Sequence, residues 1–213
     1  MTEIEVFDNW ADTYDASVAR NTTLYARYDD VLDAVVAAAR VGPGMRVLDI
    51  GVGTGNLALR CLEAGADVVG LDPSEGMLRV ARAKIGKNPL AELVKADDPF
   101  LEIPYPDGSF DAVVSTYAYH HVPEDRKPRS VEEMFRVLKP GGSLAIGDLM
   151  FESRDALNRA LATFDWLEEE NFAIIDMLEL LFAGLGAKLT HEQFTPVTWV
   201  ISAIRCELLS GAA

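Results

Sequence analysis

The chain has 213 residues, 49% of them hydrophobic, and 34 acidic against 19 basic side chains give a formal net charge of −15. This length suits one domain with a sizeable core, and the apolar content excludes a disordered chain. Because a strongly negative field repels phosphate backbones, we expect no nucleic-acid partner. The two cysteines, Cys61 and Cys206, lie far apart and form no metal-ligand or redox pair by spacing, so we expect a cytoplasmic protein.

The chain carries no segment typical of secretion or membrane insertion. Residues 1–10 contain acids where a secretory signal has basic residues. The apolar run Val31–Ala39 is interrupted by Asp33 and is far shorter than the roughly 18 residues of a membrane helix. We therefore expect no membrane partner.

The first forty residues predict two helices that form an N-terminal cap. Apolar residues at helical spacing define the first: Phe7, Trp10, Tyr14 and Val18. A second helix, capped by Asn21 or Thr22, would run to Ala39. The segment Val41-Gly-Pro-Gly44 then ends the helical pattern.

From Arg46 onward, short apolar runs alternate with helical patterns. The predicted strands are 46–50, 67–71, 90–94, 110–115 and 143–147. The predicted helices between them are 56–63, 74–83 and 131–138. This alternation predicts parallel strands joined by right-handed crossovers, and therefore an α/β fold with a doubly wound, Rossmann-like sheet.

The C-terminal part departs from a purely parallel sheet. Helical patterns at 154–170 and 174–182 precede two extended runs, 188–195 and 197–206, with little more than Pro196 between them. So short a connection predicts an antiparallel hairpin at the sheet edge, hence a mostly parallel sheet of seven strands with an antiparallel last strand. We expect one domain in four parts: a cap (1–40), a cofactor-binding core (41–150), a helical lid (151–171), and the last helix with the hairpin (172–213).

A glycine-rich loop, Val47-Leu-Asp-Ile-Gly-Val-Gly-Thr-Gly-Asn56, is the sharpest motif. Glycines between a buried strand and a helix let a ligand lie against bare backbone. A packing turn is the alternative, but glycines at three alternate positions exceed what a turn requires. The nicotinamide fingerprint G-x-G-x-x-G has its third glycine where Asn56 stands, and the Lys-Ser or Lys-Thr that closes a phosphate-binding loop is absent.

Asp72 ends the second predicted strand, 21 residues after Gly51. A carboxylate there can accept hydrogen bonds from both ribose hydroxyls of an adenosine. The alternative is a helix N-cap, because Pro73 suits a first helical position. The two roles are compatible.

Four motifs in this order resemble the signatures of class I S-adenosylmethionine-dependent methyltransferases. They are Asp49-Ile-Gly-Val-Gly-Thr-Gly55, Leu71-Asp-Pro-Ser74, Phe110-Asp-Ala-Val-Val-Ser115 followed by His120-His121, and Arg136-Val-Leu-Lys-Pro-Gly-Gly142. The resemblance spans residues 41–148, and the edge hairpin matches the family's reversed last strand. Trp10-Ala-Asp-Thr-Tyr-Asp15 and Ser115-Thr-Tyr-Ala-Tyr-His-His121 are similar to the small bacterial methyltransferase group called YrrT, which adds little about substrate.

The resemblance implies S-adenosylmethionine as cofactor and assigns roles around it. Asp49 would lie near its amino group, beside the loop formed by Gly51, Val52, Gly53, Thr54, Gly55 and Asn56. Asp72 would bind the ribose, with Pro73, Ser74 and Met77 beside the adenine, and either Asp97 or Asp98 would be the acidic residue after the third strand. Ser115, Thr116 and Tyr117 would line the methyl-transfer side.

Candidate bases follow the fourth and fifth predicted strands, where ligands bind in open α/β sheets. They are His120, His121 and Asp148, although either histidine could instead fix the loop through local hydrogen bonds. With three histidines in all and no nearby cysteine, we expect no metal. We expect His191, on the hairpin, to have a surface or packing role.

Tyr14 has two readings. Its helical spacing is typical of core packing, but the resemblance places an aromatic residue of this helix across the cofactor, where a ring attracts the sulfonium.

The inserted segment 154–170 is a candidate lid, and its acids Glu168, Glu169 and Glu170 are read as a solvated helix end. If they faced the site, they would favour a cationic amine acceptor.

The sequence favours a methyltransferase that transfers a methyl group in line to a small molecule. The alternatives are an NAD-dependent oxidoreductase and a non-catalytic protein that binds S-adenosylmethionine or its demethylated product. The identity of the methylated atom and the oligomeric state stay open.

Overall fold

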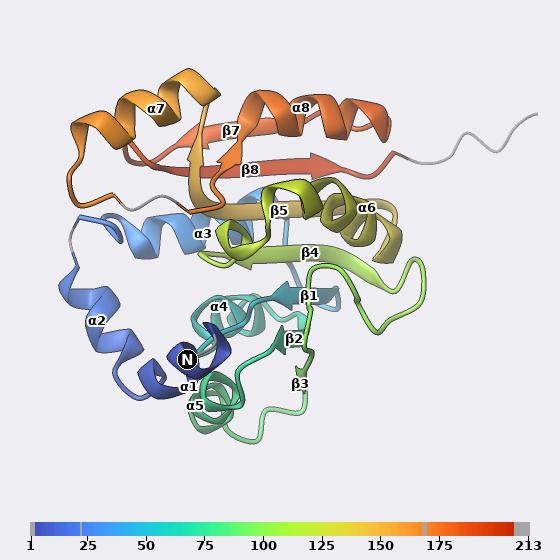
Figure 1. Cartoon of the computed structure of the whole chain (residues 1–213). Coiled ribbons are helices and arrows are strands. Elements are labelled where there is room, and N and C mark those ends of the chain that lie inside the picture. The colour runs from blue at the N-terminus through green and yellow to red at the C-terminus, as the bar shows by residue number, and fades with distance from the viewer. Residues whose placement is uncertain (1–2, 22, 168–169, 207–213) are drawn as a thin grey trace, which may run out of the picture.

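A computed structural model describes residues 3–21, 23–167 and 170–206. Its central sheet follows the order β3-β2-β1-β4-β5-β8-β7, and the short β6 pairs with β5 off this path (Figure 1). The strands are β1 (Arg46–Ile50), β2 (Asp67–Asp72), β3 (Ala91–Lys95), β4 (Phe110–Thr116), β5 (Leu138–Phe151), β6 (Ala173–Ile174), β7 (Thr190–Gln193) and β8 (Thr198–Ile204). All pairings along the path from β3 to β5 are parallel, whereas β8 is antiparallel to both β5 and β7. The predicted seven-stranded sheet with an antiparallel last strand is confirmed.

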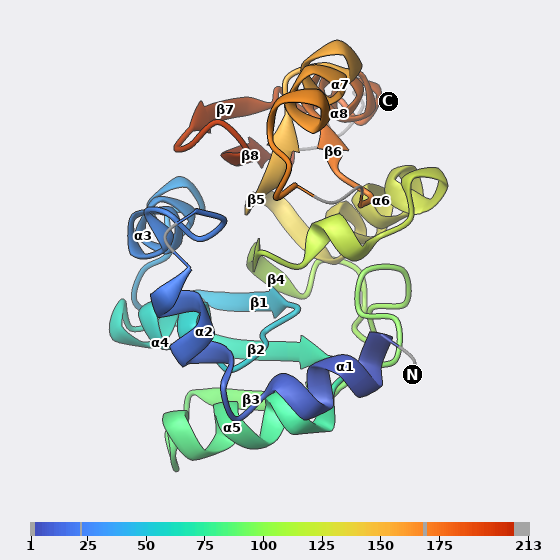
Figure 2. The ribbon, with the colours of Figure 1, turned by 60° about the vertical axis from the view of Figure 1, so that its left-hand side comes forward.

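Helices cover both faces of the sheet because neighbouring strand residues point to opposite sides. Val47 packs into the core beneath α3 (Tyr28–Ala38), α4 (Asn56–Glu63) and α5 (Glu75–Ile85). Leu48 packs into the opposite core, beneath α6 (Lys127–Val137) and α8 (Ile175–Gly184). Figure 2 shows α3 and α4 on one side of the sheet and α6 on the other.

The N-terminal cap has three helices within the described residues, not the two that were predicted. The first apolar stripe is divided between α1 (Glu3–Trp10) and α2 (Tyr14–Arg20), with a turn at 11–13. Asn21 does not begin a helix. Its Oδ1 accepts from the backbone N–H groups of Thr23 and Leu24, which lie in the turn that follows α2. The third helix, α3, begins only at Tyr28. Thr22, the other predicted cap, lies outside the described residues.

Two predicted boundaries after β5 are wrong. β5 runs to Phe151, so Asp148 lies within the strand and not beyond its end. The helix α7 (Arg154–Thr163) ends well before residue 170. The two-residue strand β6, which follows α7 in the chain, was not predicted.

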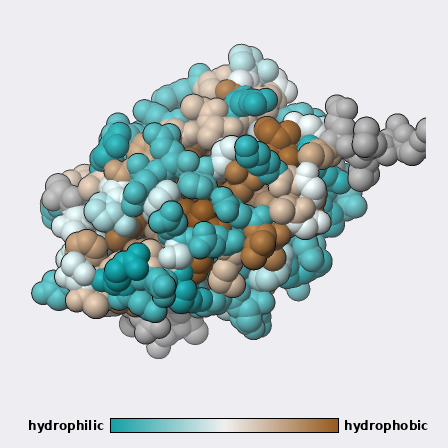
Figure 3. All heavy atoms as spheres, turned by 90° about the horizontal axis from the view of Figure 1, so that it is seen from above, coloured by the Kyte–Doolittle hydropathy of each residue, from teal (hydrophilic) through white to brown (hydrophobic). Residues whose placement is uncertain are grey.

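The surface around α7 and α8 mixes hydrophilic and apolar residues (Figure 3). Its exposed large hydrophobic side chains are Trp166, Met177, Leu180 and Leu185. Among the described residues, no helix combines the length and the apolarity needed to cross a membrane.

Candidate active site

A cavity of about 260 Å³ opens at the carboxyl ends of β1, β2 and β4. Its lining includes Gly51 after β1, Asp72 and Pro73 at the end of β2, and Tyr117 and His121 after β4. From the other side it is lined by Ile4 and Phe7 of α1, and Figure 1 shows α1 and α2 beyond these strand ends. The cavity therefore lies where the motifs predicted a ligand.

The glycine loop adopts a backbone that suits close approach of a ligand. Gly51, Gly53 and Gly55 all have positive φ angles, between 53° and 86°. A Cβ added to Gly51 would lie 2.4 Å from the Cβ of Ala118, so this glycine is required by packing. A Cβ on Gly53 would meet only the carbonyl oxygen of Gly51, at 3.9 Å, which leaves space beside the loop. Val52 is buried in the core beneath it.

Asp49 is a buried acid whose carboxylate has no partner. The residue is 1% exposed, and neither carboxylate oxygen has a hydrogen bond among the described residues. Burial, and then the charge of Asp72, raise the pKa of Asp49 to about 8, and the nearby Ala58 backbone N–H, which does not meet hydrogen-bond geometry, only weakly opposes this. An unpaired buried carboxylate is costly unless a cation neutralises it. Asp49 therefore fits the ammonium group of the predicted cofactor.

Asp72 connects the glycine loop to the start of α5. Its Oδ2 accepts from the backbone N–H of Gly53 and its Oδ1 from that of Ser74, both at 2.8 Å. Burial raises the pKa of Asp72 to about 6 despite these bonds. The helix N-cap is Ser74, whose hydroxyl accepts from Met77 N–H, so the alternative of Asp72 as N-cap is wrong. Asp72 lines the cavity, as a ribose-binding acid requires.

Asp97 and Asp98 both line the cavity, so the structure does not choose between them. The carboxylate of Asp98 lies 3.9 Å from the Arg126 guanidinium, which also lines the cavity. Phe100 adds an apolar wall there. Neither Phe100 nor Arg126 was predicted, because neither belongs to one of the four motifs.

Carboxylates of the cap hold it against the predicted cofactor residues. Asp8 Oδ1 accepts from the Ser74 hydroxyl at 2.6 Å and from Gly76 N–H at 2.8 Å. Asp15 accepts from Thr54 at 2.6 Å and from Asn56 at 3.1 Å. Thr54 and Asn56, predicted as cofactor contacts, thus bind the cap through their side chains.

Tyr14 lies within an aromatic group and is not part of the described cavity lining. Its ring centroid is 4.8 Å from that of Trp10. Burial and the neighbouring tyrosines Tyr28 and Tyr25 raise its pKa well above the usual value. The role of Tyr14 across the cofactor stays a prediction.

Of the three predicted residues at the end of β4, only Tyr117 is in the described lining. Ser115 is fully buried, and its hydroxyl donates to the Ile50 carbonyl at 2.7 Å, which joins β4 to β1. Thr116 is the last residue of β4, outside the lining. Tyr117 has a φ of 50°, a conformation that bulky residues rarely adopt and that clusters at functional sites.

His120 and Asp148 form a buried pair. His120 Nδ1 is 2.6 Å from Asp148 Oδ1, while Asp148 Oδ2 accepts from the backbone N–H groups of three consecutive residues, 118–120. Burial disfavours the imidazolium, but the charge and hydrogen bond of Asp148, followed by the charge of Glu170, raise the pKa of His120. In turn His120 outweighs burial and lowers the pKa of Asp148. The carboxylate fixes the ring and leaves Nε2 to face outward.

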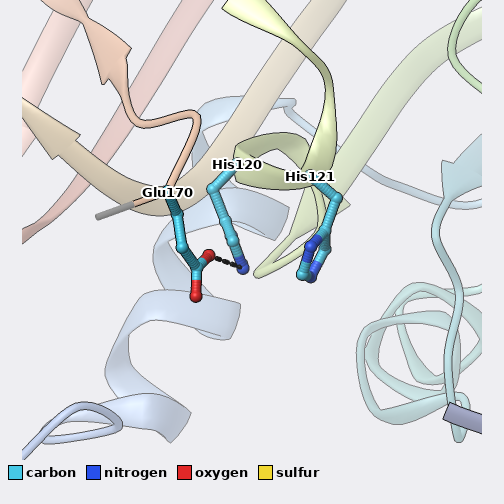
Figure 4. Close-up of side chains that lie close together, drawn as sticks. All are labelled: His120, His121 and Glu170. Carbon is cyan, nitrogen blue, oxygen red and sulfur yellow. Dashed lines mark ion pairs between the residues drawn. The ribbon is translucent and has the colours of Figure 1, made fainter. Parts of the chain in front are cut away.

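Glu170 and His121 lie beside that nitrogen (Figure 4). Glu170 Oε2 is 3.3 Å from His120 Nε2, and the centroid of the His121 ring is 4.0 Å from that of His120. Burial and the charge of His120 lower the pKa of His121 to about 3, so this ring is neutral. These three residues offer possible metal-ligand atoms within 4.8 Å of one another. Asp148 and Glu170 pair with the two nitrogens of His120 when its ring is charged, and the prediction that no metal binds stays untested.

His191 pairs with Glu179 at 3.4 Å, and its ring contacts that of Trp199 on β8. It is far along the sheet order from β1 and β4, which supports the predicted surface or packing role. Glu170 was read as part of a solvated helix end, with a site-facing position as the alternative, and its contact with His120 matches that alternative. Glu168 and Glu169 lie outside the described residues.

Comparison with known proteins identifies the family. Residues 47–142 match a family model described as a methyltransferase domain. A Geobacillus protein described as an uncharacterized methyltransferase is 35% identical, covering 94% of this chain and 96% of the relative.

Solved structures show the same fold. A SAM-dependent methyltransferase from Aquifex aeolicus matches with a TM-score of 0.67 and 20% identity, covering 96% of this chain and 100% of that chain. The DhpI-SAH complex matches with a TM-score of 0.74 and 20% identity, covering 96% and 95%. With the glycine loop and the unpartnered Asp49, these likenesses lead to one conclusion. The chain belongs to the class I S-adenosylmethionine-dependent methyltransferases.

Proposed function

We propose that the protein methylates a small-molecule acceptor by direct in-line transfer and that His120 removes the acceptor's proton. The observation that carries the second part is the 2.6 Å contact between His120 Nδ1 and Asp148 Oδ1. It fixes the ring so that Nε2 is available as a proton acceptor when the imidazole is neutral. His121, the next residue, lines the cavity, so the pair is adjacent to the cofactor side of the site.

Three groups of this chain would hold the cofactor. Asp49 would pair with its ammonium group, the backbone of Gly51 and Gly53 would lie against its amino-acid part, and Asp72 would accept from its ribose hydroxyls. When bound, S-adenosylmethionine supplies a methyl group on a positively charged sulfur, which a nucleophile attacks directly. The protein's task is then to align the nucleophile, exclude water and remove a proton.

The apolar residues Ile4 and Phe7 of α1 wall the cavity. Neighbouring elements are bound by Asp8 of α1, Asp12 of the following turn and Asp15 of α2. This supports a site for a small acceptor enclosed beneath a cap. The net charge of −15 supports the same choice, because it disfavours nucleic acid. The division into cap, core, lid and hairpin, and a cytoplasmic location, belong to this proposal.

Membership of the methyltransferases leaves no support for an NAD-dependent oxidoreductase or for a non-catalytic binding protein. Calorimetry with S-adenosylmethionine, S-adenosylhomocysteine and NAD should give binding of the first two and none of NAD. A screen of amine, thiol, carboxylate and phenol acceptors for release of S-adenosylhomocysteine then tests the transfer itself.

His120→Asn tests the base. We expect turnover to fall by roughly 100-fold or more, as for loss of a general base, with unchanged affinity for S-adenosylmethionine. Since the neutral imidazole is the active form, wild-type kcat/KM should rise with pH through the raised pKa of His120. A variant that retains wild-type turnover with the best acceptor would remove His120 from the mechanism.

A further inference from the structure

We infer that the methyl acceptor is an amine that arrives as a cation and that Glu170 binds its ammonium group. The inference rests on the proposed function and names the class of acceptor for the same site. It starts from the position of Glu170, in the segment between α7 and β6, with its carboxylate 3.3 Å from the nitrogen that would take the acceptor's proton. The Glu170 side chain is 42% exposed, so a ligand can reach it.

The charges around His120 favour a cation. Asp148 from β5 and Glu170 bring two carboxylates to the ring, while the neighbouring His121 is neutral. The cation facing this group from α6 is Lys127, whose ammonium donates to the carbonyls of Tyr119 and Val122 at 3.0 and 2.7 Å. Two of its three N–H donors are thus used by the loop. Once His120 is neutral, the two carboxylates outnumber Lys127, so a carboxylate or phosphate acceptor would meet net negative charge, whereas an ammonium would meet a partner.

Tyrosines complete a surface suited to a cation. Tyr25 lies near enough to Asp148 and Glu170 that their charges, after burial, help to raise its pKa to about 12. The Tyr25 ring is 5.2 Å from that of Tyr117. Aromatic faces attract cations, so the rings of Tyr25 and Tyr117 favour a cationic acceptor.

An arriving ammonium changes the state of His120. Once Glu170 pairs with the ammonium, it no longer stabilises the imidazolium, so His120 releases its proton to water and becomes neutral. Nε2 then takes one proton from the ammonium and leaves an amine with a free electron pair. That pair forms the new N–CH₃ bond as the S–CH₃ bond breaks, and the product amine carries the positive charge. Glu170 is accordingly a binding residue that also controls the base.

The experiment compares Glu170→Gln with the wild type and with Glu152→Gln, which removes an exposed acid just after β5. The acceptors are benzylamine, ethanolamine and putrescine, paired with benzyl alcohol, ethylene glycol and 1,4-butanediol, and release of S-adenosylhomocysteine is measured. We expect methylation of amines and not of the paired diols or alcohol. In Glu170→Gln, kcat/KM for the best amine should fall by roughly 10- to 100-fold, mainly through KM, with Glu152→Gln unchanged and Glu170→Asp partly restored.

The pH profile adds a readout that a merely structural role would not move. Loss of the Glu170 charge lowers the pKa of His120, so the acid limb of kcat/KM should move to lower pH in Glu170→Gln. NMR titration of the His120 ring checks the same shift without an acceptor. An unshifted His120 in the variant, or wild-type amine kinetics, would overturn the inference.

Three further outcomes separate this inference from others. Methylation of a phenol, thiol or carboxylate in the broader screen, with every amine inert, would overturn the amine and leave the proposed methyl transfer standing. Absence of S-adenosylhomocysteine release with all acceptors would count against the proposed function as well. Amine methylation that EDTA abolishes and zinc chloride restores would assign Glu170 to a metal, and this too would overturn the inference.

Discussion

Asp49→Asn tests whether the buried carboxylate beneath the glycine loop is held in readiness for a cation. In the free protein Asp49 has a pKa raised from 3.8 to about 8, first by burial and then by Asp72. Between these two values the unfolded chain has lost the proton and the folded chain retains it. The wild type therefore loses stability as pH rises through this interval, by about 1.4 kcal/mol per pH unit from this group.

Asparagine resembles the protonated acid in shape and does not titrate. The difference between the free energies of unfolding, variant minus wild type, should therefore increase by about 4 kcal/mol from pH 5 to pH 8. Urea unfolding at each pH measures both proteins, and taking their difference removes the other titrating groups. Parallel curves over this range would refute the reasoning, because they would mean that Asp49 is ionised in the free fold.

The bound cofactor should offset the cost of ionising the buried Asp49. A bound ammonium favours the ionised Asp49, so binding of S-adenosylmethionine at pH 7 should release a proton. Calorimetry in two buffers of different ionisation enthalpy counts that proton. Asp49→Asn should release none from this site and bind roughly 10-fold or more weakly. Equal affinity in the variant would place the ammonium elsewhere.

Three other substitutions address the loop and the cap. Gly53→Leu should remain folded but lose roughly 100-fold or more in affinity for S-adenosylmethionine, because its side chain enters the ligand's space. Gly44→Leu, with the same left-handed backbone and open surroundings, is its control, and calorimetry that finds equal binding in both would make the loop merely structural. Tyr14→Ala should weaken cofactor binding, and unchanged affinity by calorimetry would return Tyr14 to a packing role. Asp8→Ala should speed dissociation of S-adenosylmethionine in stopped-flow fluorescence, more than Asp12→Ala does, because Asp12 makes an exposed ion pair. Equal rates would show that the cap does not retain the cofactor.

The core of the fold could be predicted because its signals are local. β1, β2 and β4 coincide with short apolar runs, and α4 has the predicted bounds Asn56–Glu63. The break between α1 and α2 could not be predicted, because Trp10 and Tyr14 keep a helical spacing across it. Periodicity records which residues face the core but not whether the helix axis is continuous.

A residue of the candidate site could be predicted only where its role follows from its position after a strand. Asp72 follows its strand by a fixed spacing and lines the cavity, whereas Ser115 has the right position and an unexpected hydrogen-bond partner on β1. Glu170 reaches His120 from about fifty residues away, through tertiary packing that no spacing encodes. The contacts of Asp8 and Asp15 with the cofactor-binding core were not predicted, since a carboxylate's partner cannot be inferred from its own helix.

The position of β8 has a consequence for how the chain acquires its structure. The last strand described, Thr198–Ile204, lies between β5 and β7, so it is internal to the sheet although it is late in the sequence. Until it is synthesised, β5 presents an unpaired edge of seven residues, 143–149, that later bond to it. The strands β1 to β4, within the segment 47–142 that matches the methyltransferase model, can pair with one another before this, but the sheet stays open at β5 until β8 is made. Shortening the chain before Thr198 should therefore cause aggregation of nascent protein rather than a milder loss of activity.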